Sequence, residues 1–185
     1  MRHIGTKVLE TERLILRPFT LEDAQPMFDN WASDPEVTKF LTWPTHGSVE
    51  VTTMILQDWT AGYQKPDHYN WAITLKKDGN QPVGNISAVN VEDDIDSVEI
   101  GYCMGRRCWG RGIMTEALKE VIDFFVAEVG VKRISARHDT ANPNSGRVMQ
   151  KAGMMYEGTL RQSARNNQGI VDTACYSILA KEWKT

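Results

Sequence analysis

The chain has 185 residues, 41% of them hydrophobic, and its 21 basic and 24 acidic side chains give a formal net charge of −3 at pH 7. This length can bury a full hydrophobic core in a single domain, residues 1–185, without a metal or a disulfide, and the slightly acidic balance excludes a general attraction to nucleic acid. The three cysteines form no Cys-x-x-Cys pair, which predicts reduced thiols and no structural zinc. The sequence has no apolar run of membrane-spanning length and its N-terminus has no apolar signal core, so we expect a cytoplasmic protein.

The first third of the chain predicts one strand and two helices. The strand covers residues 14–18, because apolar and polar side chains alternate up to a proline that removes a ladder donor. One helix is capped within residues 20–23 and ends near 33–35, and a second covers 48–62. The aromatic connector at residues 40–44 is either a packed loop or a wall of a substrate groove.

The middle of the chain predicts an antiparallel meander. Strands over residues 71–75 and 83–89 flank a turn that contains Asp78-Gly79, which is a strong hairpin signal. A third strand, residues 98–104, follows a turn rich in aspartate. Connections this short allow only antiparallel neighbours, because parallel strands need longer crossovers.

The remaining elements turn this meander into a mixed sheet. Apolar residues recur at helical spacing from Gly112 to near Gly130, and this crossover helix delivers strand 133–137 parallel to strand 98–104. One short helix and two strands follow, over residues 144–152, 155–160 and 171–179. We therefore predict an α/β (α+β) domain with a mixed, mostly antiparallel sheet flanked by helices.

The turn between strand 98–104 and the crossover helix is rich in glycine and arginine. The first amides of a helix lack partners inside it and carry partial positive charge, so a turn without side-chain bulk can wrap a phosphate there. Gly110 and Gly112 supply such a turn. A tight turn alone would also explain them, whereas a dinucleotide-binding βαβ motif is rejected because Thr115 replaces its third glycine and antiparallel strands precede it.

Three motifs in order resemble one known family. Arg107-Cys-Trp-Gly-Arg-Gly112 fits [Arg/Gln]-x-x-Gly-x-[Gly/Ala] and resembles the pyrophosphate loop of the GCN5-related N-acetyltransferases. Glu99-x-Gly-Tyr102 before it and Asn142-Pro-Asn-Ser145 after it have the spacing of the RimJ/RimL branch, which acetylates ribosomal-protein N-termini. The resemblance implies a sheet that splays at a β-bulge near Gly101, although that glycine in a strand also fits the close approach of a ligand.

The resemblance also implies acetyl-CoA as co-substrate and no metal. The implied coenzyme-binding residues are Tyr102, Cys103, Met104, Arg107, Cys108, Trp109, Gly110, Arg111, Gly112, Ile113, Met114, Asn142 and Ser145. Among these, the amides of residues 107–112 are expected to hold the pyrophosphate, and amides near Cys103 to polarise the thioester carbonyl. Asn142 and Ser145 are expected to contact the coenzyme arm, with helix capping as their structural alternative.

Two residues are expected to move protons in direct attack by the amine. The resemblance implies Glu99 as general base, directly or through water, and Ser145 as the acid that protonates the departing thiolate. Position alone also allows Glu99 to be an ordinary solvent-facing strand residue.

Other candidate groups are interpreted as structural. We expect Tyr156 to be a core tyrosine and His138 to lie outside the site. A cysteine acyltransferase that uses Cys103 or Cys108 is disfavoured, because the sequence places no histidine beside either thiol.

The expected activity is transfer of acetyl to a primary amine, and the favoured acceptor is a protein N-terminal α-amino group. Its pKa of about 7.8 leaves far more neutral amine at pH 7 than a lysine pKa of about 10.4. A polyamine or aminoglycoside acceptor and a non-catalytic acyl-CoA-binding module remain open. Residues 40–47 and 62–69 are expected to select the acceptor, and the protein to be a monomer or homodimer without membrane or direct nucleic-acid binding.

Overall fold

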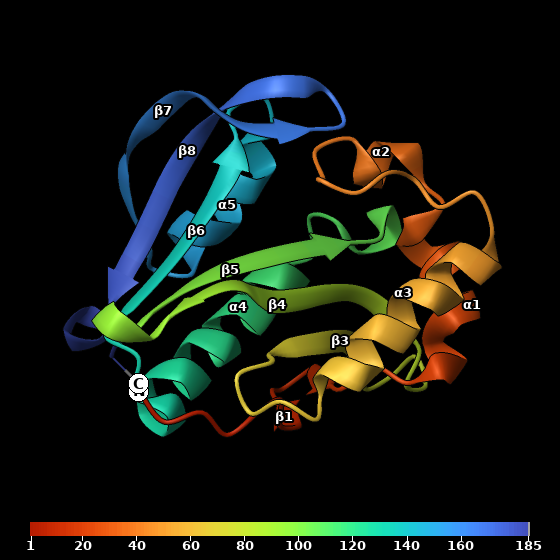
Figure 1. Cartoon of the computed structure of the whole chain (residues 1–185), viewed down its shortest axis with the longest axis horizontal. Coiled ribbons are helices and arrows are strands. Elements are labelled where there is room, and N and C mark those ends of the chain that lie inside the picture. The colour runs from red at the N-terminus through yellow and green to blue at the C-terminus, as the bar shows by residue number, and fades with distance from the viewer. Residues whose placement is uncertain (185) are drawn as a thin grey trace.

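An eight-stranded sheet runs through the structure, a computed structural model that describes residues 1–184 (Figure 1). The strands lie in the order β1-β2-β3-β4-β5-β6-β8-β7, and within the described residues only β5 and β6 pair in parallel. Their bounds are β1 (Leu9–Glu10), β2 (Leu14–Arg17), β3 (Asn70–Leu75), β4 (Pro82–Glu92), β5 (Ser97–Met104), β6 (Arg133–Asp139), β7 (Met155–Asn166) and β8 (Gly169–Leu179). The predicted mixed, mostly antiparallel sheet is confirmed.

Helices cover both faces of this sheet. Their bounds are α1 (Ala24–Met27), α2 (Pro35–Thr38), α3 (Val49–Gly62), α4 (Ile113–Phe124) and α5 (Pro143–Lys151). Side chains from α1, α2 and α3 form a buried cluster on one face, and those of α4 and α5 join the main core on the other. Over residues 1–184, no helix combines the length and apolar character that a membrane span requires.

The first predicted helix differs most from its expectation. A 3-10 turn, the short α1 and a π-helical turn, Phe28–Ala32, replace a regular helix. Pro26 lies within α1, where its nitrogen cannot donate a hydrogen bond. The chain then restarts at α2, where the Asp34 side chain accepts a hydrogen bond of 3.0 Å from the Glu36 amide.

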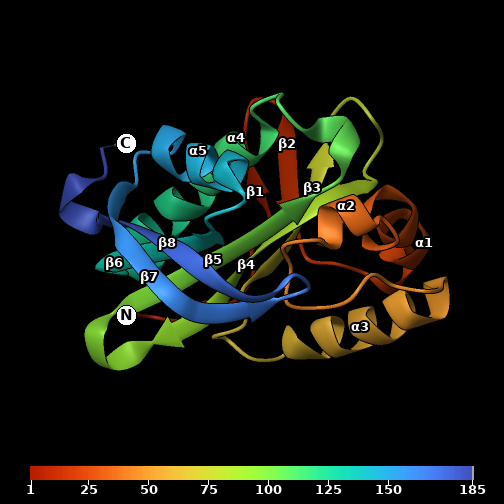
Figure 2. The ribbon, with the colours of Figure 1, turned by 90° about the horizontal axis from the view of Figure 1, so that it is seen from above.

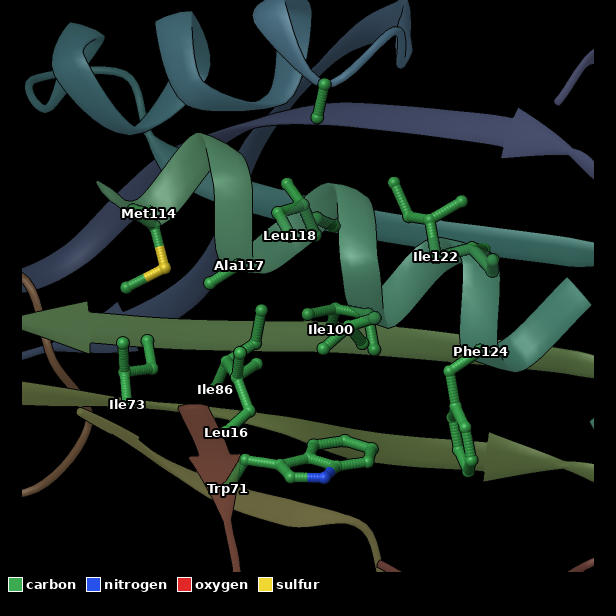
Figure 3. Close-up of a cluster of buried hydrophobic side chains, with 14 of the residues drawn as sticks. Leu16, Trp71, Ile73, Ile86, Ile100, Met114, Ala117, Leu118, Ile122 and Phe124 are labelled. Carbon is green, nitrogen blue, oxygen red and sulfur yellow. The ribbon is translucent and has the colours of Figure 1, made fainter. Parts of the chain in front are cut away.

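The main core lies between α4 and the sheet (Figure 3). In Figure 3, Met114, Ala117, Leu118 and Ile122 of α4 lie above the strands that carry Leu16, Ile86 and Ile100, and these side chains all belong to one buried cluster. Burying each of the larger side chains contributes about 1.5–3 kcal/mol. Trp71 is fully buried and packs edge-on against Phe124, and its indole nitrogen donates to the Lys7 carbonyl at 2.7 Å, so the one polar atom of this ring has a partner.

The parallel pairing between β5 and β6 ends soon after it begins. It joins residues 97–99 to residues 133–135, and β5 beyond Glu99 pairs only with β4. The two strands therefore diverge, as Figure 1 shows. Because the remaining edge of β5 is not taken by β6, its backbone groups face an opening in the sheet.

A β-bulge lies at the start of this opening, as expected, but on the neighbouring strand. The register of β4 against β5 shifts between Ala88 and Asn90, which leaves Val89 as the extra residue, whereas Gly101 pairs in register with Ser87. A Cβ on Gly101 would lie 2.7 Å from Cγ1 of Val89. The missing side chain of Gly101 thus makes room for the bulged valine.

Two glycines of the β4–β5 pair give a testable contrast in stability. A Cβ on Gly84 would lie 2.5 Å from the backbone carbonyl of Cys103, which cannot move without breaking the ladder. We expect Gly84→Ala to lower the free energy of unfolding by about 1–3 kcal/mol. Gly101→Ala should cost less, because Val89 is 59% exposed and can change rotamer. Urea unfolding measures both variants, and equal losses would contradict this account.

Candidate active site

The loop from β5 to α4, residues 105–112, ends in two glycines with left-handed backbone. Gly110 has φ +71° and Gly112 has φ +73°, a region that side chains other than glycine rarely adopt. Gly112 is the N-cap of α4, and its carbonyl accepts the Glu116 amide at 3.0 Å. The preceding amides of the first turn have no partner inside the helix. The loop therefore presents free donors at the positive end of α4.

Arginine side chains add positive charge to this loop. Arg106 is paired with Asp34 of the α2 N-cap, with its Nε 2.5 Å from the carboxylate. In the chain up to residue 184, neither Arg107 nor Arg111 has a carboxylate within ion-pair distance. Both are exposed, so they remain available to an anionic ligand.

Several of the expected coenzyme ligands have their side chains turned into the protein. The buried ones are Cys103, Met104, Cys108, Ile113 and Met114. Any contact from these residues to a ligand must come from the backbone. Trp109 is 49% exposed, and its indole nitrogen donates to the Met104 carbonyl at 2.7 Å, which closes the loop back onto the end of β5.

Tyr102 of β5 and Ser145 of α5 are joined by two hydrogen bonds. The Tyr102 hydroxyl donates to the Ser145 carbonyl at 2.9 Å, and Ser145 Oγ donates to the Tyr102 hydroxyl at 3.2 Å. Burial raises the pKa of Tyr102, so the phenol stays protonated at physiological pH. The structure thus brings the expected serine beside a tyrosine of the expected motif.

Asn142 is the N-cap residue of α5, but its side chain makes no capping hydrogen bond. The neighbouring Asn144 instead accepts a hydrogen bond from Arg147 at 2.9 Å. Side-chain capping therefore does not account for these asparagines, and the Asn142 amide is half-buried without a capping partner.

Glu99 lies at the point where β5 leaves β6, on the strand face that carries Cys103. Its side chain is 21% exposed, and its Oε1 lies 2.8 Å from Nε of Arg137. Sequence reasoning missed Arg137. Its signal was the parallel register, because Ser135 pairs with Glu99 and Arg137, two residues later, projects from the same face of β6.

A second carboxylate, that of Glu157, has both of its oxygens in hydrogen bonds. Both oxygens of Glu157 are bound by Arg133, at 2.9 and 2.5 Å, and Ser177 donates to one of them at 2.7 Å. The hydrogen bonds from Arg133 and then Ser177 lower the pKa of Glu157 to about 2. Glu157 is therefore a poor proton acceptor at neutral pH.

The two thiols near the opening are poorly suited to nucleophilic catalysis. Cys103 is buried and donates to Asn85 Oδ1 at 3.3 Å, and burial raises the pKa of its thiol to about 12. Burial also raises the pKa of Cys108. Within residues 1–184, neither thiol is hydrogen-bonded to a histidine. The nucleophilic route thus lacks a base as well as a thiolate.

His138 was expected to be structural and Tyr156 to lie in the core, and only the first expectation agrees with the contacts of the residue. His138 Nδ1 donates to the Asp139 carbonyl at 2.7 Å, and the ring packs over Gly146 of α5, which agrees with a structural role. Tyr156 was expected in the core, but it is 51% exposed and its hydroxyl pairs with Thr159 at 2.8 Å. The prediction is wrong because β7 is an edge strand that pairs only with β8.

The connector at residues 40–44 is held by the tip of the β7–β8 hairpin. The Asn167 side chain donates to the carbonyls of Thr38 and Trp43, each at 2.8 Å, and its amide donates to Leu41 at 3.1 Å. Figure 2 shows the hairpin reaching across to the α2 segment. Residues 62–69 contact a different segment, since Pro66 and His68 accept hydrogen bonds from residues 5 and 6.

A groove of about 680 Å³ lies away from Glu99 and from the 105–112 loop. It runs along the outer side of α4 beside the end of α5 and the C-terminal segment. It includes neither Glu99 nor any residue of the 105–112 loop, so it is not the site described above.

Comparison with known proteins points to one family. A family model described as an acetyltransferase (GNAT) domain matches residues 13–155. The uncharacterized N-acetyltransferase YoaA of Bacillus subtilis is 33% identical over 172 residues, which cover 93% of this chain and 96% of that protein. The ribosomal-protein-serine acetyltransferase of Escherichia coli is 25% identical over 137 residues, covering 74% of this chain and 75% of that one.

A solved structure shares the fold. The microcin C7 self-immunity acetyltransferase MccE, in complex with acetyl-CoA and AMP, superposes with a TM-score of 0.81 at 20% identity. The match covers 91% of this chain and 93% of that chain.

The environments of the three cysteines predict the order in which they react. Cys175 is partly exposed, whereas Cys103 and Cys108 are buried. We expect iodoacetamide at pH 8 to modify Cys175 first and the other two only slowly, because burial keeps them as thiols. Peptide mass spectrometry at timed intervals measures this order, with urea-denatured protein as the control. Rapid labelling of native Cys103 would contradict it.

Proposed function

The chain belongs to the GNAT acetyltransferase family and is an N-acetyltransferase, and from this premise we propose that its acceptor is a protein N-terminal α-amino group. The observation that carries the proposal is the placement of Glu99, a partly exposed carboxylate whose Oε1 lies 2.8 Å from Nε of Arg137, at the start of the β5–β6 opening. The E. coli relative, which is named for acetylating a serine of a ribosomal protein, supports this acceptor class. We propose that residues 1–185 act as one such domain in the cytoplasm.

The donor in this proposal is acetyl-CoA, and the loop at residues 105–112 fits its pyrophosphate. Left-handed Gly110 and Gly112 leave the amides at the start of α4 accessible. Arg107 and Arg111, which make no ion pair within residues 1–184, supply the opposite charge. We propose that Asn142, whose side chain makes no capping bond, contacts the coenzyme arm.

The thioester is proposed to lie in the opening along β5. Beyond Glu99 this edge of β5 is not paired with β6, so backbone amides near Cys103 can donate to the oxygen that becomes negative during attack. Tyr102 bonds to Ser145 at the far side of the same opening.

The reaction proposed is direct attack in a ternary complex. The neutral amine attacks the thioester carbon, the carbon–sulfur bond breaks, and the product is an amide and a thiol. Glu99 takes the proton released by the amine, directly or through water, while Arg137 holds the carboxylate in place through Oε1. Ser145, which is oriented by Tyr102, gives its hydroxyl proton to the thiolate and recovers a proton from solvent water.

An acceptor screen tests the proposed function. The protein is incubated with acetyl-CoA and with peptides that begin with alanine or serine, polyamines or aminoglycosides, and free thiol is measured. We expect turnover with the peptides and, by mass spectrometry, acetylation of their α-amine. Turnover only with small amines would refute the acceptor. Coenzyme binding without turnover of any amine would indicate an acyl-CoA-binding module.

The loop assignment predicts a specific loss of coenzyme binding. Gly112→Asp would place a carboxylate and a strained backbone where the phosphates are held, so calorimetry should show weaker binding of acetyl-CoA. Gly130→Asp is the matched control, because Gly130 also has a left-handed backbone, φ +80°, but follows the other end of the α4 segment. Equal affinities in the two folded variants would remove the loop assignment.

The assignment of Glu99 predicts a loss of rate rather than of coenzyme affinity. Glu99→Gln keeps the size of the side chain but removes the proton acceptor, so turnover at neutral pH should fall by about 10²–10⁴. The loss should shrink as the pH approaches the pKa of the amine, since the neutral form then needs no base.

Arg137→Gln is the control for Glu99→Gln, because it breaks the same ion pair and keeps the Glu99 carboxylate. If the arginine variant loses as much activity as the glutamate variant, the ion pair matters and base catalysis by Glu99 is not supported.

A further inference from the structure

Arg13, in the turn between β1 and β2, binds both the 105–112 loop and the start of α4, which are distant from it in sequence. One guanidinium nitrogen, Nη1, donates to the Arg111 carbonyl at 3.0 Å. Nε and Nη2 lie 2.6 Å from Oε2 of Glu116, in the first turn of α4. The Arg13 amide also donates to Oε1 of Glu116 at 3.0 Å. One side chain thus joins the last peptide of the loop to the helix that follows it.

The bond to the Arg111 carbonyl fixes the direction of the Gly112 amide. In a trans peptide the carbonyl and the amide of the same unit point in opposite directions. Because the Arg111 carbonyl points at Arg13, the Gly112 N–H points away from it. Gly112 is exposed, and over residues 1–184 its amide donates to no backbone carbonyl outside the regular elements. It is therefore a free donor with a set orientation.

The ion pair between Arg13 and Glu116 compensates a negative charge beside the same loop. A free carboxylate one turn from Gly112 would repel a phosphate. Thr11 donates to Oε1 of Glu116 at 2.5 Å, and Arg13 occupies Oε2, so both oxygens are bound on the side of the β1–β2 turn. The guanidinium also lies close to the loop, since a Cβ on Gly112 would be 3.6 Å from Nη2 of Arg13.

We propose that Arg13 is a positioning residue that orients the Gly112 amide toward the pyrophosphate of the coenzyme and neutralises Glu116 beside it. The inference rests on the proposed function of the loop. It assigns to the β1–β2 turn a part in coenzyme binding, although this turn lies about 100 positions earlier in the chain than the loop.

The test compares donors with and without a pyrophosphate. Coenzyme A affinity is measured by calorimetry, and acetyl transfer is measured with acetyl-CoA and with S-acetylpantetheine, which lacks the pyrophosphate. Arg13→Gln should weaken coenzyme A binding by about tenfold, as expected for loss of a hydrogen bond from a charged group. It should leave kcat/KM for S-acetylpantetheine within about twofold of the wild type.

Two further variants separate positioning from charge. Lys119→Gln removes one positive charge from the exposed side of α4 and should bind coenzyme A as the wild type does. Arg13→Lys keeps the charge, but one ammonium cannot reproduce the fork that reaches both Arg111 and Glu116, so its affinity should stay close to that of Arg13→Gln. Thermal unfolding confirms that each variant is folded.

Three outcomes would overturn the inference. They are wild-type affinity in Arg13→Gln, full rescue by Arg13→Lys, and an equal loss with S-acetylpantetheine. Failure of the proposed function looks different, because the wild-type protein itself would then neither bind coenzyme A nor transfer acetyl from either donor.

Discussion

The structure depends on how short the parallel pairing of β5 with β6 is. Three residues of each strand pair, and the strands then separate. In a closed sheet every inner backbone group is satisfied by a neighbour, so a binding site for an extended ligand would have to lie outside it. Here the opening lies inside the sheet, between two strands that the core holds firmly on the α4 side. A ligand that enters it can pair with β5 much as a strand would.

Contacts around the opening stabilise the divergence of β5 from β6. The bulge at Val89 interrupts the β4–β5 register next to Glu99, where β5 and β6 begin to separate. Tyr102 ties the far part of β5 to Ser145 in α5, and Trp109 closes the following loop onto Met104. The splayed geometry is therefore held by side chains of both the sheet and the loop, rather than by β6.

The two sides of the opening differ in their charges and in how these charges are paired. The loop before α4 combines exposed arginines with left-handed glycines, so it suits a dianionic group. The face that carries Glu99 holds paired charges, Glu99 with Arg137 and Glu157 with Arg133, of which Glu157 has both oxygens bound. This asymmetry is consistent with the roles proposed above, an anionic group of the donor at the loop and proton transfer from the amine at Glu99.

The sequence alone determined what depends on neighbours along the chain. The period of apolar residues located strand 98–104 and the helix after Gly112, the spacing of the arginines and glycines identified the loop between them, and connection lengths specified which strands run parallel. Only the tertiary structure decided which distant side chains meet these elements. Arg137 on Glu99, Asn167 on the 40–44 connector and Arg13 on the loop are all contacts across the chain, and the exposure of Tyr156 follows from the edge position of β7. Local periodicity records which face of an element is apolar, but it carries no record of the partner, because the partner is chosen by packing between elements that are far apart in sequence.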